Sequence, residues 1–347
     1  MYFRGHMKIS LNWLKQHIEL NESAAVLAEK LTGCGLEVES VALTSSVEGG
    51  LEGLLIGEVL FCEPIPDTDH LNKTRVRVGE DLELPIVCGA ANVKAGLKVV
   101  VAPPGTTIYP TGGEPFTIGK RKLKGEVSEG MICAEDEIGL GTDHSGIMIL
   151  DDAAPVGMAV ADYLKIEKDE VLEIGLTAFR GDAASHRGVA RDLSALFDRP
   201  LNPVKSAFIP FSGATHWTIE LEDEACPRYS GLLMENIEVK PSPEWLQNRL
   251  RSLGLNPINN IVDITNYVLH DLGQPIHAFD ADQIQGDKII VRKGLGGKTF
   301  VTLDDVSRTL DADDLMICDA QGPMAIAGVF GGKNSGVSEK TTRIFIE

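Results

Sequence analysis

Aromatic residues and long apolar runs are both scarce in this sequence. Only 5% of its 347 residues are aromatic, so a surface rich in rings that stack on nucleic-acid bases is not expected. A membrane-spanning helix needs about 18 or more apolar residues in succession, and no run comes close to that length. The first residues, MYFRGHM, lack the apolar core of a signal peptide. The sequence therefore predicts a protein without a membrane span, and residues 1–6 are predicted to be a cloning scar before the natural start at Met7.

Neither the cysteines nor the histidines occur at the spacing of a metal site. The six cysteines are scattered and form no C-x-x-C pair, so we expect reduced thiols in a cytoplasmic protein and no disulfide framework. None of the eight histidines lies at zinc-site spacing from another histidine or from a cysteine. The sequence therefore predicts no metal site.

Positive charge is in short supply, with 32 basic against 51 acidic residues and a net charge of −19. A field of this sign does not attract polyanions, so nucleic acid could be bound only through a local basic patch or a larger assembly. From Lys94 to Lys124, six basic residues stand against one acid, Glu114. A solvated hairpin and a contact for a single strand or a tRNA backbone both fit this patch, and composition alone favours the hairpin. The contact residues would be Lys120, Arg121, Lys122 and Lys124.

The predicted secondary structure changes from one segment of the chain to the next. Residues 7–47 predict two short helices, capped by Ser10 and Ser23, and then a strand. Short β runs separated by glycine and proline between 48 and 154 predict a small barrel. Residues 155–205 return to mixed structure, and an α/β region follows from 206, with helices around PEWLQNRLRSLGL and IVDITNYVLHDLG. A chain of this length predicts two or three domains.

Two glycine-rich stretches match a phosphate-binding loop only in part. The GKT at 297–299 ends like a P-loop, but Arg292 stands where the first glycine is required. In GVFGGKNSG, Ala327 stands at that place and Asn334 replaces the serine or threonine. Tight β turns explain both stretches better, so a P-loop NTPase is not predicted. The glycines of VFGG still offer a place where bare backbone could approach a ligand.

His277 lies in the segment QPIHAFD, between two apolar residues. Its polar companions in the sequence are Asn266, on the preceding helix pattern, and Asp280. The pattern alone favours a structural histidine. Because imidazole titrates near neutral pH, a general base that activates water is the functional alternative.

Taken together, these segments resemble the β chain of bacterial phenylalanyl-tRNA synthetase. The resemblance extends from Met7 to Glu347, and so many matches in order are highly specific. It is carried by ISLNWLKQHI, GLEVES, GEVLFCEPIPDTDHLNKTRVRVG, IVCGAANVKAGLKVVVAPPGTTI, KLKGEVSEGMICAEDEIGL, HSGIMIL, GVARDLSALF, ACPRYSG, IVDITNYVLHDLGQPIHAFD and AIAGVFGGKNSGVSE. One turn departs from the family, because TAFR at 177–180 stands where the family has Thr-Pro-Asn-Arg.

The resemblance implies an α+β, multidomain fold. Residues 7–47 plus 155–205 would form a discontinuous N-terminal α+β domain. An OB-fold β-barrel that binds tRNA, residues 48–154, would be inserted into it. Residues 206–347 would form an incomplete mixed α/β editing domain, truncated at its C-terminal end, because the chain stops in the strand-like run RIFIE.

The resemblance also implies a function and partners. In the family, the full α2β2 tetramer charges tRNA(Phe) with phenylalanine on its α chain, using ATP and Mg²⁺, so no cofactor is expected on this chain. The implied partners are tRNA(Phe) and the synthetase α chain. This region would bind tRNA and hydrolyse mischarged Tyr-tRNA(Phe). The alternative is a structural, tRNA-binding region that braces the α chain and has no hydrolytic activity.

The same resemblance assigns residues to an editing pocket. His277 and Asn266 would lie beside the attacking water. Gly331 would allow close approach of the aminoacyl group, and Glu347 would accept the tyrosine hydroxyl. Because Glu347 is the last residue of the sequence, an incomplete, weak or inactive editing site is expected. The same cleft would be lined by Thr265 and Pro275.

Overall fold

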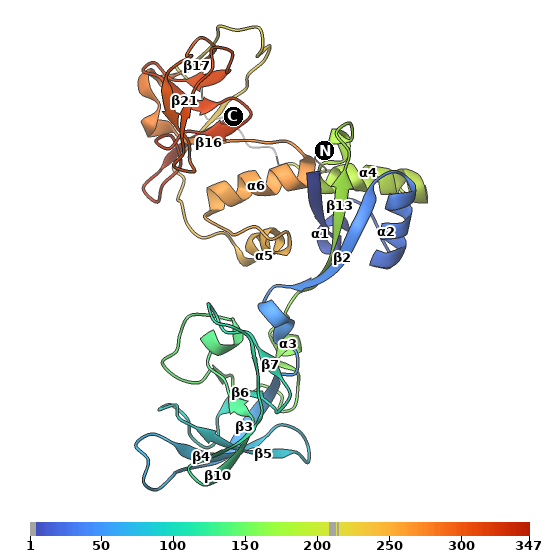
Figure 1. Cartoon of the computed structure of the whole chain (residues 1–347), viewed down its shortest axis with the longest axis vertical. Helices are drawn as coiled ribbons and strands as arrows, with labels where there is room; N and C mark the ends of the chain where they lie inside the picture. Colours follow the sequence, from blue (N-terminus) through green and yellow to red (C-terminus); the bar gives the residue numbers. More distant parts are fainter. Residues whose placement is uncertain (1–4, 208–212, 214) are drawn as a thin grey trace. The chain divides into compact units, whose positions relative to one another are not determined.

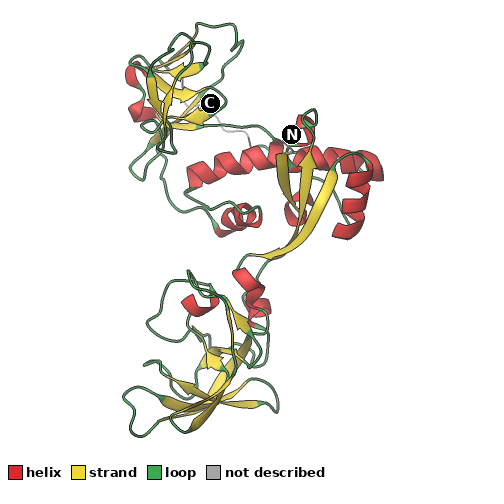
Figure 2. Cartoon of the chain, viewed as in Figure 1, coloured by secondary structure: helices red, strands yellow, loops and turns green. Residues whose placement is uncertain are grey.

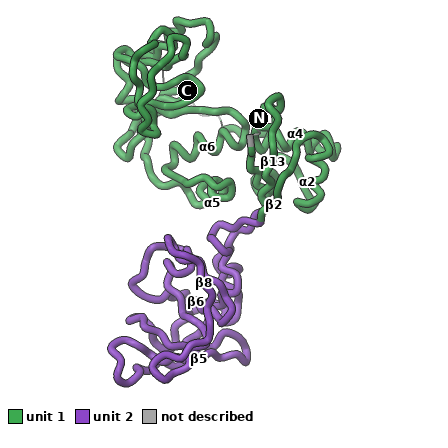
Figure 3. Tube along the Cα trace, viewed as in Figure 1, with its two compact units in different colours: residues 1–42, 170–347 green, residues 43–169 purple. Residues whose placement is uncertain are grey.

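The computed structural model describes residues 5–207, 213 and 215–347. It has two compact units: Met1–Ala42 with Glu170–Glu347, and Leu43–Asp169 (Figure 3). Helices and strands are both present in each unit (Figure 2). Of the predicted cloning scar, residues 1–4 lie outside the described residues, and residues 5 and 6 belong to the first strand. Within the described part of the chain, no helix is long and apolar enough to cross a membrane.

The first unit begins with a three-stranded sheet and the helices beside it (Figure 1). Its elements are β1 (Gly5–Ser10), α1 (Leu11–Leu14), α2 (Ala24–Gly33), β2 (Glu37–Ser45), β13 (Lys168–Leu176) and α4 (His186–Phe197). The strand order is β1-β13-β2, with β1 antiparallel to β13. The hydroxyl of Ser10 accepts from the backbone N–H of Trp13, and that of Ser23 accepts from the N–H of Val26. The two predicted helix caps are therefore confirmed.

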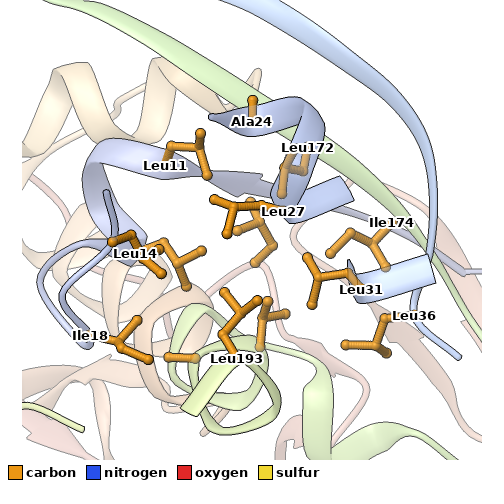
Figure 4. Close-up of a cluster of buried hydrophobic side chains, with 14 of the residues drawn as sticks. Leu11, Leu14, Ile18, Ala24, Leu27, Leu31, Leu36, Leu172, Ile174 and Leu193 are labelled. Atoms are coloured by element: carbon orange, nitrogen blue, oxygen red, sulfur yellow. The ribbon is translucent and has the colours of Figure 1, made fainter. Parts of the chain in front are cut away.

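One apolar core joins these helices to the sheet. Leu27 and Leu31 lie one turn apart on α2 and are fully buried, as is Leu193 of α4. Leu172 and Ile174 alternate along β13, so they face the same side of the sheet. These side chains meet in a single cluster (Figure 4). Burial of each such leucine contributes roughly 1.5–3 kcal/mol, so the core holds together two segments that the whole second unit separates in the sequence.

The second unit is a nearly closed barrel. Its strands are β3 (Leu55–Pro64), β4 (Asn72–Arg77), β5 (Glu83–Cys88), β6 (Lys98–Ala102), β7 (Thr107–Ile108), β8 (Phe116–Thr117), β9 (Lys120–Leu123), β10 (Glu126–Glu129), β11 (Met131–Ile132) and β12 (Ile149–Leu150), and its helix is α3 (Val160–Tyr163). The main sheet runs β11-β6-β3-β4-β5, and β11 also contacts β5 at the other end. Gly57 of β3 is needed for space, because an added Cβ would lie 2.6 Å from Val101 and 2.7 Å from Val76. The small barrel predicted from the turn-rich sequence is therefore present.

Among the described residues, the rest of the first unit holds two α-helices and three sheets. Its elements are α5 (Glu244–Ser252), α6 (Asn260–Leu272), β14 (Thr218–Leu221), β15 (Leu232–Glu235), β16 (Ala278–Asp280), β17 (Lys288–Arg292), β18 (Thr299–Val301), β19 (Ser307–Thr309), β20 (Met316–Cys318), β21 (Pro323–Ile326), β22 (Phe330–Gly331) and β23 (Arg343–Ile346). One sheet has the order β14-β17-β20-β21-β22, another has the order β15-β23-β16, and the smallest pairs β18 with β19. Asn259 caps α6, and Gly273 ends it with a φ of 78°.

A buried polar network ties α6 to the N-terminal helices. The indole N–H of Trp13 donates to Asp271 at 2.7 Å, and Nε2 of His17 lies 2.6 Å from the same carboxylate oxygen. The ring of Trp13 is stacked between His186, at 4.1 Å between centroids, and Tyr267, at 4.7 Å. The two hydrogen bonds from Trp13 and His17 hold the pKa of Asp271 below its usual value against the opposing effect of burial. The C-terminal half of α6 is therefore fixed on α1 and α4.

Candidate active site

The site begins where β16 and β23 run side by side. The two strands are antiparallel, with Ala278 opposite Ile346. One residue further along, the N–H of Glu347 donates to the carbonyl of His277 at 2.9 Å, and the N–H of His277 donates back at 3.4 Å. This register makes two residues that are far apart in the sequence direct neighbours.

The imidazole of His277 is half-buried and packs against Phe279. The edge of its ring meets Phe279, with 4.5 Å between centroids and 75° between planes. Among the residues that the structure describes, nothing forms a hydrogen bond with its buried Nε2. Burial lowers the pKa of His277, so the ring is neutral at pH 7. A buried nitrogen without a partner is uncommon in folded proteins and is typical of a group that meets water or a ligand.

Gly331 of β22 lies directly against this imidazole, with no room between them for a side chain. A Cβ added to Gly331 would lie 2.9 Å from Cε1 and 3.1 Å from Nε2 of His277, and 2.9 Å from Cδ1 of Leu303. The φ of Gly331 is not in the left-handed region, so space and not backbone conformation requires the glycine here. The ring of His277 therefore faces bare backbone on this side.

Glu347 is half-buried and already holds one hydrogen bond. The phenol of Tyr229 donates to Oε2 of Glu347 at 2.6 Å. Burial raises the pKa of Glu347, and the hydrogen bond from Tyr229 partly opposes that rise. Burial and the nearby carboxylate also raise the pKa of Tyr229, so the phenol stays protonated and donates. His277, Gly331, Glu347 and Tyr229, which we call the His277 cluster, thus contain an imidazole base packed on bare backbone, an acceptor and its donor.

The other predicted pocket residues stand outside these contacts. Thr265 and Asn266 lie on α6, which packs against β16. The hydroxyl of Thr265 donates to the carbonyl of Val262 at 2.7 Å within the helix. Within residues 5–207, 213 and 215–347, the side chain of Asn266 makes no hydrogen bond. Pro275 is exposed on the loop that joins α6 to β16. The structure therefore brings His277, Gly331 and Glu347 together, and places Asn266, Thr265 and Pro275 on the neighbouring helix and loop.

The four predicted contact residues of the patch lie on a hairpin made of β9 and β10, whereas Lys94 precedes β6 and Lys98 lies in it. Lys120 pairs with Glu129 across the hairpin, with Nζ 3.1 Å from the carboxylate. Arg121 lines a small pocket together with Phe116, and Lys122 projects from the opposite face of the strand because side chains alternate. Lys124 stands at the turn, with a φ of 48°. The hairpin thus presents cations on two faces and at its tip, and one of them is neutralised.

Two family descriptions match separate parts of this chain. Residues 54–159 match a putative tRNA binding domain, and residues 225–347 match the B3/4 domain. The chain is 49% identical to a phenylalanine–tRNA ligase beta subunit from Bacteroides thetaiotaomicron, over 98% of this chain and 42% of the relative. It is 51% identical to the same subunit from Porphyromonas gingivalis, with the same coverage. The chain belongs to the phenylalanine–tRNA ligase beta subunit family. It spans about two fifths of the length of the curated relatives it matches.

A solved structure is more distantly similar. The N-terminal fragment of the phenylalanyl-tRNA synthetase beta-subunit from Pyrococcus horikoshii shares 14% identity and a TM-score of 0.30, over 51% of this chain and 55% of its own. So low a score carries no argument about the fold. The family resemblance predicted from the sequence is confirmed by the curated relatives.

The two candidate sites fall in the two matched regions of this beta-subunit family member. The His277 cluster lies within the B3/4 match, and the hairpin lies within the putative tRNA binding match. Sequence reasoning did not single out Tyr229 or Leu303. Tyr229 is in the matching segment ACPRYSG, but its partner Glu347 is 118 residues away. No local pattern reports a contact of that range, so only the β15-β23-β16 sheet could reveal it.

Proposed function

We propose that this chain is the tRNA-binding and editing part of a phenylalanine–tRNA ligase beta subunit. Its activity is the hydrolysis of tyrosine esterified in error to tRNA(Phe), while the complete enzyme charges tRNA(Phe) with phenylalanine. The observation that carries the hydrolytic part is the His277 cluster, in which a neutral, unpartnered imidazole stands beside bare backbone and a half-buried carboxylate.

The chemistry of the substrates explains why a second site is needed. Tyrosine is phenylalanine with one added hydroxyl, and an apolar pocket rejects such an addition only by about 10²-fold. A second site that requires the hydroxyl discriminates in the opposite direction. Its buried acceptor is left unpaired by phenylalanine, which costs roughly 1–3 kcal/mol or more. Glu347 offers such an acceptor.

Each residue of the site then has a role. His277 takes a proton from the attacking water, which a neutral imidazole does well at pH 7. Gly331, which carries no side chain, lets the aminoacyl group approach the backbone next to the imidazole. Glu347 accepts the hydroxyl of the tyrosyl side chain. Asn266 orients the water from α6, and the cleft is completed by Thr265 and Pro275.

We assign the nearly closed barrel to the OB-fold class, at residues 48–154. Residues 7–47 plus 155–205 are proposed as the discontinuous domain around it, and residues 206–347 as the editing domain. The tRNA backbone would lie along the β9–β10 hairpin, with Lys120, Arg121, Lys122 and Lys124 as its contacts. All four β9 side chains are exposed and three of them are positively charged, which supports this placement.

The complete enzyme's ATP, Mg²⁺ and α chain, in an α2β2 tetramer, belong to the same proposal. The described residues include no group of three or more histidine, cysteine, aspartate or glutamate side chains placed to hold a metal ion. We assign the ATP and Mg²⁺ to the α chain of the complete enzyme, and ester hydrolysis by the His277 cluster as proposed needs neither.

The experiment that tests the hydrolytic proposal is deacylation under single-turnover conditions, with this chain in excess over tRNA. The absolute rate is expected to be low, in line with the weak site expected from the sequence. Tyr-tRNA(Phe) should still be hydrolysed at least about tenfold faster than Phe-tRNA(Phe), since an unpaired acceptor costs about 1–3 kcal/mol. Equal hydrolysis of the two esters would contradict selective editing. Hydrolysis of neither, together with intact tRNA binding, would instead favour a structural region that binds tRNA and braces the α chain.

Binding of tRNA should depend on the hairpin and on salt. Replacing Lys122 and Lys124 together by alanine is expected to weaken binding of tRNA(Phe) by on the order of tenfold and to lower the slope of log K against log salt by about 2. The measurement is a filter-binding or fluorescence titration at several salt concentrations. Lys30→Ala is the control. Lys30 is an exposed residue of α2 in the other unit, so this change removes a lysine and leaves the hairpin intact. Equal effects of the two changes, or an unchanged slope, would exclude the hairpin as a tRNA contact.

A further inference from the structure

We propose that Tyr229 is a positioning residue for the editing site, which holds the Glu347 carboxylate in place and keeps it an acceptor for the hydroxyl of tyrosine. The proposal rests on the proposed editing function. Among the described residues, Tyr229 is the one side chain that forms a hydrogen bond with the Glu347 carboxylate. A phenol and a carboxylate at 2.6 Å form a charge-assisted bond, which is stronger than a neutral one.

Tyr229 is itself held firmly in place. Two residues further on, Gly231 packs so closely against β23 that an added Cβ would overlap the ring of Phe345. The chain then continues into β15, where Leu232 stands opposite Ile346. The ring of Tyr229 packs against the apolar core that contains Phe345. Strand β23 therefore fixes Tyr229 from one edge, as it fixes His277 from the other.

The bond leaves room for a second phenol. An ionised carboxylate has about four acceptor positions on its two oxygens, and Tyr229 occupies one on Oε2. Oε1 has no partner among the residues that the structure describes. A tyrosyl substrate can therefore donate to Glu347 while Tyr229 stays bound. The phenol of Tyr229 holds the carboxylate in place and does not compete with the substrate hydroxyl for the same acceptor position.

Ionisation of Glu347 decides whether the site selects for tyrosine. A neutral carboxyl group carries a proton of its own and loses the charge that strengthens its bond to a phenol. Burial raises the pKa of Glu347, and the bond from Tyr229 acts in the opposite direction. The titratable side chain in contact with this carboxylate is Tyr229, with Cys226 behind the phenol, and His277 of β16 meets Glu347 through backbone hydrogen bonds. Because the imidazole is neutral at pH 7, Tyr229 is the group that favours the ionised form.

The test is the titration of Glu347 followed by carbon-13 NMR of its carboxyl in this chain and in Tyr229→Phe. Loss of the phenol is expected to raise the titration midpoint of Glu347 and to lower the preference for Tyr-tRNA(Phe) over Phe-tRNA(Phe) by on the order of tenfold. Tyr267→Phe is the matched control, since it removes a phenol from a half-buried tyrosine of the same unit that stacks on Trp13. It should change neither quantity.

A double-mutant cycle separates positioning from general damage to the fold. On a Glu347→Gln background, Tyr229→Phe should have no further effect on selectivity, because the phenol has no charge left to hold. An unchanged midpoint in Tyr229→Phe, or an equal shift in Tyr267→Phe, overturns the positioning role. If the unaltered chain hydrolyses neither ester while Tyr229→Phe still raises the midpoint, the editing function fails and the positioning of Glu347 by Tyr229 stands.

Discussion

Replacing His277 by alanine is expected to slow the hydrolysis of Tyr-tRNA(Phe) by about 100- to 10,000-fold, which is the usual contribution of a general base. The reason is geometric: the buried Nε2 of His277 has no hydrogen-bond partner among the described residues and lies against the bare backbone of Gly331. The measurement is the single-turnover rate of deacylation at saturating protein. Binding of tRNA should be unaffected, because the hairpin that we propose for it lies in the other unit.

The pH profile gives the same residue a second test. Burial lowers the pKa of His277, so the imidazole stays unprotonated to a lower pH than the 6.5 of an ordinary histidine. Hydrolysis by the unaltered chain should hold as pH falls through 6.5 and then decline as the ring takes up a proton, and this decline should vanish in His277→Ala. His216→Ala removes an exposed histidine of the same unit and serves as the control. If His277→Ala hydrolysed Tyr-tRNA(Phe) as fast as the control His216→Ala, His277 would not be the general base.

Replacing His186 by alanine is expected to lower the free energy of unfolding of the first unit by about 3–5 kcal/mol. His186 is fully buried at the start of α4. Its Nε2 accepts from the backbone N–H of Ser10 at 3.0 Å, and its Nδ1 donates to the carbonyl of His270 at 2.7 Å. Alanine would leave both backbone groups without a partner and a cavity beside the indole of Trp13. All three tryptophans lie in this unit, so urea unfolding followed by tryptophan fluorescence reports on it alone.

The same histidine makes the first unit sensitive to acid. Complete burial lowers the pKa of His186 to about 3, whereas an unfolded histidine titrates near 6.5. The folded state therefore favours the neutral ring, and this stabilisation is fully present above pH 6.5. It is lost as pH falls toward 3, by up to about 1.4 kcal/mol for each pH unit. In His186→Gln, this part of the dependence of the unfolding free energy on pH should disappear. The control His216→Gln should retain it. An unchanged slope in His186→Gln would show that other groups cause the acid sensitivity.

The predictions made from local sequence pattern agree with the structure for features that depend on interactions between residues close in the sequence. Ser10 and Ser23 cap the helices that follow them, because a side-chain oxygen reaches the free N–H groups of a first turn. The helices expected around residues 244–252 and 260–272 are present. The turn-rich run of short strands forms the barrel.

The functional residues could not be identified from local sequence pattern alone. By pattern alone His277 was better explained as a structural histidine, and only the resemblance to a known family suggested that it acts on water. The structure adds its neutral state, an Nε2 without a hydrogen-bond partner among the described residues, and its packing against the bare backbone of Gly331. Nothing in the sequence indicated that Trp13, His17 and Asp271 would meet in a buried network. Each of those residues has an ordinary local context, and their contacts cross 254 or more positions.

The sequence by itself determined the elements, the net charge and the family, because periodicity, caps, turns and ordered motifs are written in consecutive residues. Only the tertiary structure decided that Glu347 meets His277 on one side and the phenol of Tyr229 on the other. The physical reason is the register of β23 between β15 and β16. A shift of one residue along that strand would turn every side chain to the opposite face, and no local stretch of sequence specifies such a pairing.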